Sequence, residues 1–427
     1  MANDLSQSSA RGKDNLLAAL GPGLLWAGTA VGVSHLVQST RAGAGYGMTL
    51  LTVVLLANLL KYPAFEAAPR YTSTTGKSLL QAYREQGRWA LVLFLLLTVG
   101  TMFTVLGAVT IVTAGMASQL ISDGLSTTAW SAVLLVGSGV LLASGKFKAL
   151  EGLMKVLMLV LTISTLIAIT MLLGKVQWSS IPWWPPLGEL EPAKIAFIVA
   201  LVGWMPSAID IAVWQSLWSL EKQRTEGHKL TFRGSAFDFK VGYFGTVALA
   251  VCFVLMGAGV LYGTGQTLPK SAGAFAATFI GMYVDVLGEW SRPVVMIAAF
   301  STMLSTTITV SDGFPRALEA AIARLSSDEE EMGARTPTYW GALVFVGAGA
   351  LLIIWQFASN LKALVDLATT LSFLTAPVLA WLNFRAVNSD RVPVEHRPRG
   401  AFRALHVVGI LFTGALAAGF LYMKAIG

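Results

Sequence analysis

The sequence alternates long apolar stretches, most of them about 20 residues or longer, with short polar segments. A helix of about 20 apolar residues crosses the ~30 Å hydrocarbon core of a bilayer. The qualifying stretches cover residues 16–45, 47–68, 89–120, 127–144, 148–174, 194–219, 240–263, 293–323, 337–357, 361–384 and 403–425. The sequence therefore predicts an all-α integral membrane protein with about 11 transmembrane helices.

Composition agrees with lipid as the solvent. Apolar residues make up 55% of the 427 and charged residues only 12%, whereas a soluble domain carries roughly 25% charge. One more apolar segment, 272–288, is short and amphipathic, so it predicts an interfacial helix and not a span. Cys252 is the single cysteine, which excludes an intrachain disulfide and a cysteine-based metal cluster.

The basic residues set the predicted orientation. Despite the net charge of +7 they form no patch but fall in short clusters between the apolar runs, so we expect no nucleic-acid partner. With the N-terminus in the cytoplasm, about 20 of the 30 Lys and Arg lie in inside segments, as the positive-inside rule requires. An odd number of spans then places the C-terminus outside, and the cytoplasmic (inner) membrane of a bacterium is the predicted location.

Two of the predicted spans have interrupted centres. Gly28, Gly32 and Ser34 weaken span one about midway, and Gly203 and Pro206 interrupt span six. Proline removes a backbone donor and clashes with the preceding turn. Interrupted helices five spans apart are typical of inverted-repeat transporters, whose binding site lies between the breaks at the bilayer midplane. The pattern predicts a secondary transporter of a small solute.

Four segments resemble the NRAMP family of metal-ion transporters: GPGLL at 21–25, AGAGYG at 42–47, the Met205-Pro206 pair and STTIT at 305–309. The resemblance implies a leucine-transporter-like fold of the amino-acid/polyamine/organocation superfamily. In one transporter domain, 1–427, it would place a cytoplasmic tail at 1–15, a first repeat at 16–174, an inverted second repeat at 194–384 and a peripheral helix at 403–425.

The departures from the family pattern concern the metal site. Typical members bind the ion through the Asp and Asn of an Asp-Pro-Gly-Asn segment, and the alignment places Gly32-Val33-Ser34-His35 there. Met205 keeps the methionine ligand of the family. The other polar positions of the family become Ser207 and Ala212 (two His), Thr101 and Thr104 (acids near the proton route) and Thr369 (the first Gln of span ten). The resemblance thus implies the family scaffold with a rebuilt site.

The breaks and the alignment together give a set of candidate residues. A divalent ion gives up water only for strong oxygen, nitrogen or sulfur ligands, so a transported metal would bind Met205, His35 and Asp210, with Asp210 supplying the charge that Gly32 lacks. The full set of predicted substrate-binding residues is Gly32, Ser34, His35, Trp204, Met205, Asp210 and Thr369.

His35, Asp210 and Arg41 are the predicted gating or coupling residues, and each has a structural alternative. His35 binds solute or carries a proton, or it caps the half-helix after the break. Asp210 is a functional acid, or it forms a capping box with Ser207. Arg41 attracts an anionic group and repels cations, or it snorkels to the outer interface or pairs with a nearby acid.

The remaining candidates have equally plain alternatives. Met205 is a soft metal ligand or a filler of the apolar core. Trp204 lines the cavity or faces lipid. Thr369 hydrogen-bonds a substrate or, as is more usual for a threonine inside a bundle, a neighbouring helix.

Three functions follow from these residues. The first is transport of a metal or other small cation, with selectivity altered by loss of the family's Asp ligand. The second is transport of a small organic solute, zwitterionic or anionic, held by half-helix N-termini and attracted by Arg41. The third is a receptor-like membrane protein that does not transport.

Absent motifs and composition complete the prediction. No phosphate-binding Gly-rich loop, His-Glu-x-x-His or nucleophile elbow occurs, so neither an enzyme nor a nucleotide-driven pump is expected. The predicted partners are the lipid bilayer and the small solute, with a coupling ion such as H+ where transport is ion-driven. No cofactor is predicted and no oligomeric state is specified.

Overall fold

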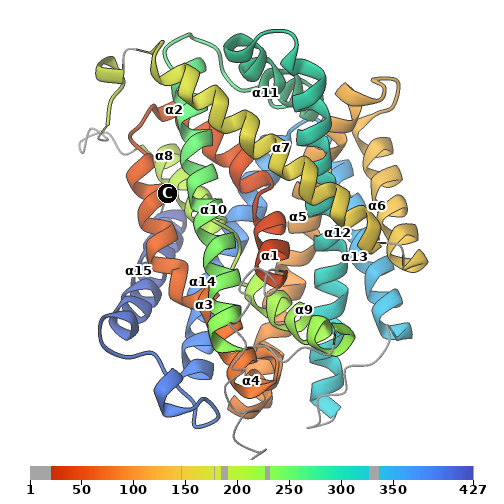
Figure 1. The fold of residues 1–427 in the computed structure, drawn as a ribbon, viewed down its shortest axis with the longest axis vertical. Coiled ribbons are helices and arrows are strands. Elements are labelled where there is room, and N and C mark those ends of the chain that lie inside the picture. Colours follow the sequence, from red (N-terminus) through yellow and green to blue (C-terminus); the bar gives the residue numbers. More distant parts are fainter. Residues whose placement is uncertain are drawn as a thin grey trace, which may run out of the picture.

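The computed structural model describes residues 21–145, 147–176, 178–183, 191–226, 231–326 and 336–426. The predicted tail, 1–15, and the first five residues of the predicted span one, 16–20, lie outside the described residues. Within the described chain every regular element is a helix (Figure 1).

The predicted plan of spans is confirmed, with bounds that shift by a few residues. Nine continuous helices of the described chain are long and apolar enough to cross a membrane: α3 (Leu51–Thr75), α5 (Arg88–Leu120), α6 (Thr127–Ser144), α7 (Phe147–Leu173), α10 (Phe232–Val260), α12 (Ser291–Ser326), α13 (Pro337–Phe357), α14 (Leu361–Val387) and α15 (Gly400–Ile426).

Spans one and six are the interrupted ones, as predicted. Span one consists of α1 (Pro22–Ala30), a π-helical turn (Ser34–Ser39) and α2 (Thr40–Tyr46). Span six consists of α8 (Pro192–Gly203) and α9 (Ile211–Glu226). Added to the nine continuous helices, these two interrupted segments make up the eleven spans.

Two shorter helices lie between spans. α11 (Ala272–Leu287) occupies the segment predicted as a short helix outside the set of spans. α4 (Leu79–Gln86) was not predicted, because its stretch resembles a polar basic loop. Ser78 caps α4 by accepting a hydrogen bond from the amide of Gln81 at 3.3 Å, and Leu79, Leu80 and Tyr83 are buried beneath it. Single 3-10 turns occur at Trp178–Ser180 and Val394–His396.

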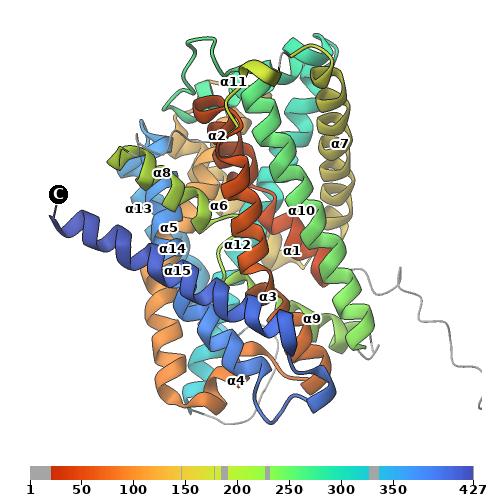
Figure 2. The same cartoon turned by 90° about the vertical axis from the view of Figure 1, so that its left-hand side faces the viewer.

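The two five-span halves contact each other through equivalent elements. The second span of the first half, α3, packs against α9, which is the second piece of the broken span six. Correspondingly, the second span of the other half, α10, packs against α2, the second piece of the broken span one. The pieces of the two broken spans pack against α10, α12 and α14 (Figures 1 and 2). Each half therefore packs against the other half's interrupted span.

Glycines allow the close contacts that this arrangement needs. A Cβ on Gly203 would collide with the backbone carbonyl of Thr369, so α8 and α14 touch backbone to backbone. A Cβ on Gly43 would likewise collide with the carbonyl of Val254, where α2 meets α10. Small residues at helix contacts are the usual means of close packing between membrane helices.

The start of α1 is fixed by an acid from span seven. The carboxylate of Asp238 accepts hydrogen bonds from the amides of Gly21 (2.9 Å) and Gly23 (2.6 Å). The first amides of a helix lack intrahelical partners, and a carboxylate is a good acceptor for them. This bond ties α1 to α10 at the end of the bundle where span one begins.

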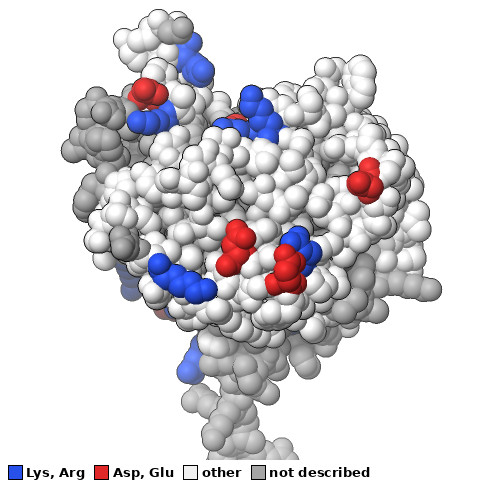
Figure 3. Space-filling view, turned by 90° about the horizontal axis from the view of Figure 1, so that it is seen from above, with Lys and Arg blue, Asp and Glu red and all other residues white. Residues whose placement is uncertain are grey.

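The outside of the bundle suits contact with lipid. Large apolar side chains are exposed on it, for example those of Leu96, Val136 and Val344. α15 crosses α3 and α14 obliquely at the periphery (Figure 2), with Gly409 against the carbonyl of Leu60. Seen from above, the end of the molecule carries a few charged side chains, some of them acids beside bases, on a mostly uncharged face (Figure 3).

Candidate functional site

The first break interrupts span one directly after Ala30. Val31 and Gly32 leave the helical path, and the chain resumes in the π-helical turn. The amide of Gly32 donates to the carbonyl of Ala30 at 2.9 Å, and Ser34 Oγ donates to the same oxygen at 2.8 Å. A Cβ at Gly32 would press on the side chain of Thr306, so this glycine lets the break approach α12.

The second break separates α8 from α9. Residues 204–210 between them form no helix. The predicted capping box, with Ser207 as the cap and Asp210 three positions into the helix, is wrong. The helix begins at Ile211, so Asp210 directly precedes it. A carboxylate at this position lies at the positive end of the α9 dipole.

A small cavity lies between the two breaks. Its volume is about 30 Å³, which is enough for one water molecule or one ion. Residues of both breaks, of α5 and of α12 line it: Thr29, Ala30, Val33, Ser34, Val105, Val109, Trp204, Ser207, Ala208, Asp210, Ile211, Trp214, Thr306 and Val310. The structure thus brings three of the predicted binding residues, Ser34, Trp204 and Asp210, to one space.

Asp210 is the only ionisable residue among those that line this cavity. It is 7% exposed. The ion pairs of the described chain do not include it. The cavity is therefore a mostly apolar space with a few hydroxyl groups and one acid.

His35 is turned away from this cavity and toward α10. Its Nε2 lies 2.9 Å from the carbonyl of Thr246, and its Nδ1 lies 2.7 Å from Ser34 Oγ. Because a carbonyl only accepts, Nε2 carries the proton and donates it to Thr246. Both ring nitrogens thus have protein partners, and the side chain is fully buried.

Met205 also points elsewhere. It belongs to a separate apolar cluster that contains Val54, Phe197 and Phe373, and it is fully buried. Its neighbour Trp204 does line the cavity and donates from Nε1 to Ser372 Oγ at 2.8 Å. Of the three predicted metal ligands, only Asp210 reaches the cavity.

A lysine that was not among the predicted site residues lies at the second break. Lys61, near the middle of α3, is 1% exposed, and its Nζ donates to the carbonyls of Val202 (3.1 Å), Gly203 (3.0 Å) and Ser207 (2.7 Å). The signal was present in the sequence, because a lone lysine inside an apolar span is a functional candidate by default. Its acceptors, 141 to 146 residues away, were not visible there.

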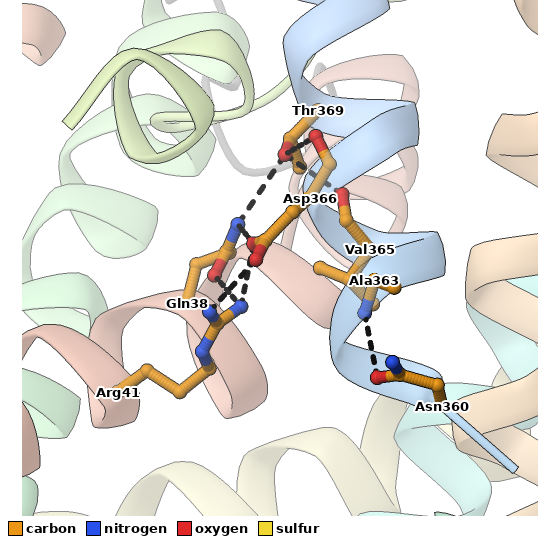
Figure 4. Close-up of polar contacts among 7 residues, drawn as sticks. All are labelled: Gln38, Arg41, Asn360, Ala363, Val365, Asp366 and Thr369. Atoms are coloured by element: carbon orange, nitrogen blue, oxygen red, sulfur yellow. Dashed lines mark hydrogen bonds and ion pairs between the residues drawn. The ribbon is translucent and has the colours of Figure 1, made fainter. Parts of the chain in front are cut away.

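Arg41, the second residue of α2, lies in a polar cluster between α2 and α14. Its Nη1 and Nη2 donate to the two oxygens of Asp366 at 2.7 and 3.0 Å, and Nη1 also donates to Gln38 Oε1 at 2.8 Å. Figure 4 shows the guanidinium and the carboxylate facing each other between α2 and α14. Arg41 Cζ also lies 4.8 Å from the centre of the Phe197 ring on α8. One side chain therefore connects three helices.

Thr369 belongs to this cluster and not to the cavity. Its hydroxyl donates to the carbonyl of Val365 at 2.7 Å and accepts from Gln38 Nε2 at 3.3 Å (Figure 4). This is the helix-to-helix role. A larger cavity, of about 660 Å³, adjoins the cluster and is lined in part by Arg41, Asp366, Lys362 and Lys194. We call it the vestibule.

The described residues include no group of three or more His, Cys, Asp or Glu that could hold a metal ion. Among them the cavity between the breaks offers one carboxylate, and Ser207 is one of its lining residues. Thr101 and Thr104 are not, and their hydroxyls donate to carbonyls of their own helix.

The sequence matches a family model described as natural resistance-associated macrophage protein-like over residues 23–423. The chain belongs to the Nramp family. This Nramp-family member is also 34% identical, over 411 residues, to an uncharacterized protein of Pasteurella multocida (strain Pm70), covering 96% of this chain and 93% of that one.

Solved structures share its fold. The manganese transporter of Eremococcus coleocola, in complex with an aromatic bis-isothiourea substituted compound, has a TM-score of 0.70 at 15% identity, covering 94% of this chain and 85% of that one. MhsT in complex with L-phenylalanine has a TM-score of 0.65 at 14% identity, with coverage of 94% and 97%. The predicted leucine-transporter-like fold, with inverted five-span repeats and broken helices one and six, is confirmed, and this Nramp-family member is a membrane transporter.

Proposed function

We propose that this Nramp-family member carries a small cation across the membrane by alternating access and binds it at Asp210, between the two breaks. The observation that supports this is the Asp210 carboxylate, which lines the cavity and forms no ion pair within the described chain. Burying a charge without an oppositely charged group in direct contact costs several kcal/mol. A cation that enters the cavity removes that cost, so the geometry favours a positively charged cargo.

The charged residues near the cavity limit the net positive charge of the cargo. Asp210 contributes one negative charge, and Lys61 places one positive charge at the same break. A bare divalent ion needs several strong ligands and compensation for two charges. Since His35 and Met205 are directed elsewhere, we propose that the selectivity has shifted from divalent metals to a cargo with a single positive centre.

An organic solute is the second candidate, and the vestibule supports it. That space is about 660 Å³, and its charged lining residues are Arg41, Lys194, Lys362, Glu191 and Asp366. A zwitterion would place its positive group at Asp210, and charged side chains of both signs in the vestibule would attract its two ends on the way in. A zwitterion has one positive centre for Asp210 and no net charge, which matches the zero sum of the Asp210 and Lys61 charges.

The Arg41 cluster is proposed as the gate of the vestibule. Arg41 and Asp366 join α2 to α14 with a bidentate pair, and Arg41 also contacts α8. With the N-terminus in the cytoplasm, this end of span one faces outward, so opening the outer path requires that pair to separate. Asp210 is the proposed site for exchange of a coupling H+, because it is the acid that the cargo contacts.

Uptake into proteoliposomes tests the proposal. The purified full chain is reconstituted and supplied in turn with labelled manganese, rubidium, methylammonium and L-alanine. We expect saturable uptake of at least one singly charged or zwitterionic probe and little uptake of manganese. Asp210→Asn keeps the shape of the side chain and removes its charge, so it should lower that uptake by about tenfold or more, equivalent to about 1.4 kcal/mol.

Asp285→Asn is the matched control, because Asp285 is an exposed acid on α11, outside the cavity. It should leave uptake unchanged. Rapid uptake of manganese that depends on Asp210 would overturn the shift in selectivity and restore a metal as cargo. Uptake of an organic probe that survives Asp210→Asn would overturn the role of Asp210.

A further inference from the structure

The Lys61 ammonium lies where the second break exposes backbone oxygens. The last carbonyls of a helix have no intrahelical partner, and α8 ends at Gly203. Two of the three acceptors of Lys61, the carbonyls of Val202 and Gly203, belong to that end, and the third, of Ser207, belongs to the unwound segment. The negative end of the α8 dipole adds to the attraction for positive charge.

The hydrogen bonds of this group are complete. An ammonium has three N–H donors and no acceptor, and Lys61 has three carbonyl partners between 2.7 and 3.1 Å. A neutral amine would leave one of the three carbonyls without a donor. The geometry therefore fits the charged form.

Carbonyl groups at an unwound helix end are also the usual ligands of small mobile cations in transporters of this architecture. Here a side chain from α3 reaches the same kind of acceptors. The ammonium is held by a covalent stem that packs in the protein interior, with the Phe65 ring 5.7 Å from Nζ. It cannot leave the site as an ion would.

We propose that Lys61 is a built-in cation: its ammonium occupies the carbonyl oxygens of the span-six break, fixes the shape of that break and excludes a mobile cation from it. Lys61 is a positioning residue and touches no cargo. It holds Ser207 and the end of α8, and thereby sets where Trp204 and Asp210 meet the cavity. This role is independent of which solute Asp210 binds.

Chemical replacement of the missing ammonium tests the proposal without any transport assay. Lys61→Ala leaves room for a small amine, and thermal unfolding of the purified full-length variant is followed in detergent by tryptophan fluorescence. We expect a lower Tm than in the wild type and a saturable rise in Tm with ethylammonium chloride. Tetramethylammonium chloride at the same ionic strength has the charge but no N–H donor, so it should give no rise.

Three controls make the result decisive. The wild type should show no rise in Tm with ethylammonium, because its carbonyls are occupied. Lys424→Ala removes an exposed lysine on α15 and should behave like the wild type. A folded Lys61→Ala variant with no response to ethylammonium, or with an equal response to both salts, would overturn the proposal.

A second pair of variants tests the same role if Lys61→Ala does not fold. Lys61→Arg keeps the positive charge and its donors, and Lys61→Met keeps the volume of the stem but has neither. Under the proposal the Arg variant retains a Tm closer to the wild type than the Met variant does. The opposite order would show that Lys61 contributes packing alone, and the built-in cation would be rejected.

Discussion

At the scale of single residues, neighbours in the sequence have separate tasks at the first break. Ser34 lines the cavity, whereas His35 reaches away from it to the carbonyl of Thr246. Both ring nitrogens of His35 have partners in the protein, which is the arrangement of a buried polar residue with a structural role. The geometry therefore favours the structural alternative for His35 over solute binding.

A pair of substitutions separates these tasks. His35→Ala should lower the stability by about 1–3 kcal/mol, because the Thr246 carbonyl loses its buried donor. It should leave the apparent affinity for the transported probe unchanged. Ser34→Ala should change KM as well as Tm, because Ser34 lines the cavity and its Oγ is also the partner of His35 Nδ1. Thermal unfolding and the concentration dependence of uptake measure both. A large rise in KM in a stable His35→Ala variant would make His35 a binding residue.

The sequence predicted the helix breaks and the buried acid, because these depend on residue type alone. It did not predict the direction in which each side chain points. Gly32 and Pro206 mark the breaks because each disfavours a helix by its own backbone, and Asp210 stood out as an acid in an apolar span. His35 points away from the cavity because the chain forms a π-helical turn after the break. No residue in the sequence predicts that turn. Met205 faces a different cluster because of the path of the non-helical residues 204–210, which the sequence alone does not define.

At the scale of helices, contacts distant in sequence decide which elements move together. Arg41 on α2 and Asp366 on α14 lie 325 positions apart, and the side chains are 8% and 35% exposed. From the sequence, Arg41 is a predicted gating residue in an apolar span, and pairing with a nearby acid is one structural alternative. That alternative is the one the structure shows, but nothing in the sequence identified Asp366 as the acid.

A double-mutant cycle tests the coupling of these helices. Arg41→Gln and Asp366→Asn should each lower the rate of uptake, because each leaves the other charge without its partner. The double variant should be no slower than the worse single one, so the two effects should not add. Initial rates in proteoliposomes give the coupling. Strictly additive effects would indicate that the pair does not act as one gate.

At the scale of the whole molecule, the order of spans fixes which loops share a side. With the N-terminus in the cytoplasm, the α5–α6 loop at 121–126 faces out and the α14–α15 loop at 388–399 faces in. Cys252 is the single cysteine and is buried, so the wild type is already a suitable background for labelling.

Labelling of introduced cysteines tests the orientation of the protein in the membrane. A membrane-impermeant maleimide added to intact cells should label Asp123→Cys, which is exposed between α5 and α6. It should label Asp390→Cys, whose native side chain is fully exposed, only after the membrane is opened. The reverse pattern would invert the predicted topology, and with it the outward placement of the Arg41 gate.

The exchange of contacts between the halves, α3 against α9 and α10 against α2, has a mechanical consequence. Since each repeat packs against the interrupted span of the other, we expect that neither repeat tilts alone. A rocking motion that starts at either face must therefore propagate to the opposite face in the same stroke. We expect this coupling to limit leakage, because movement at one face would be tied to movement at the other.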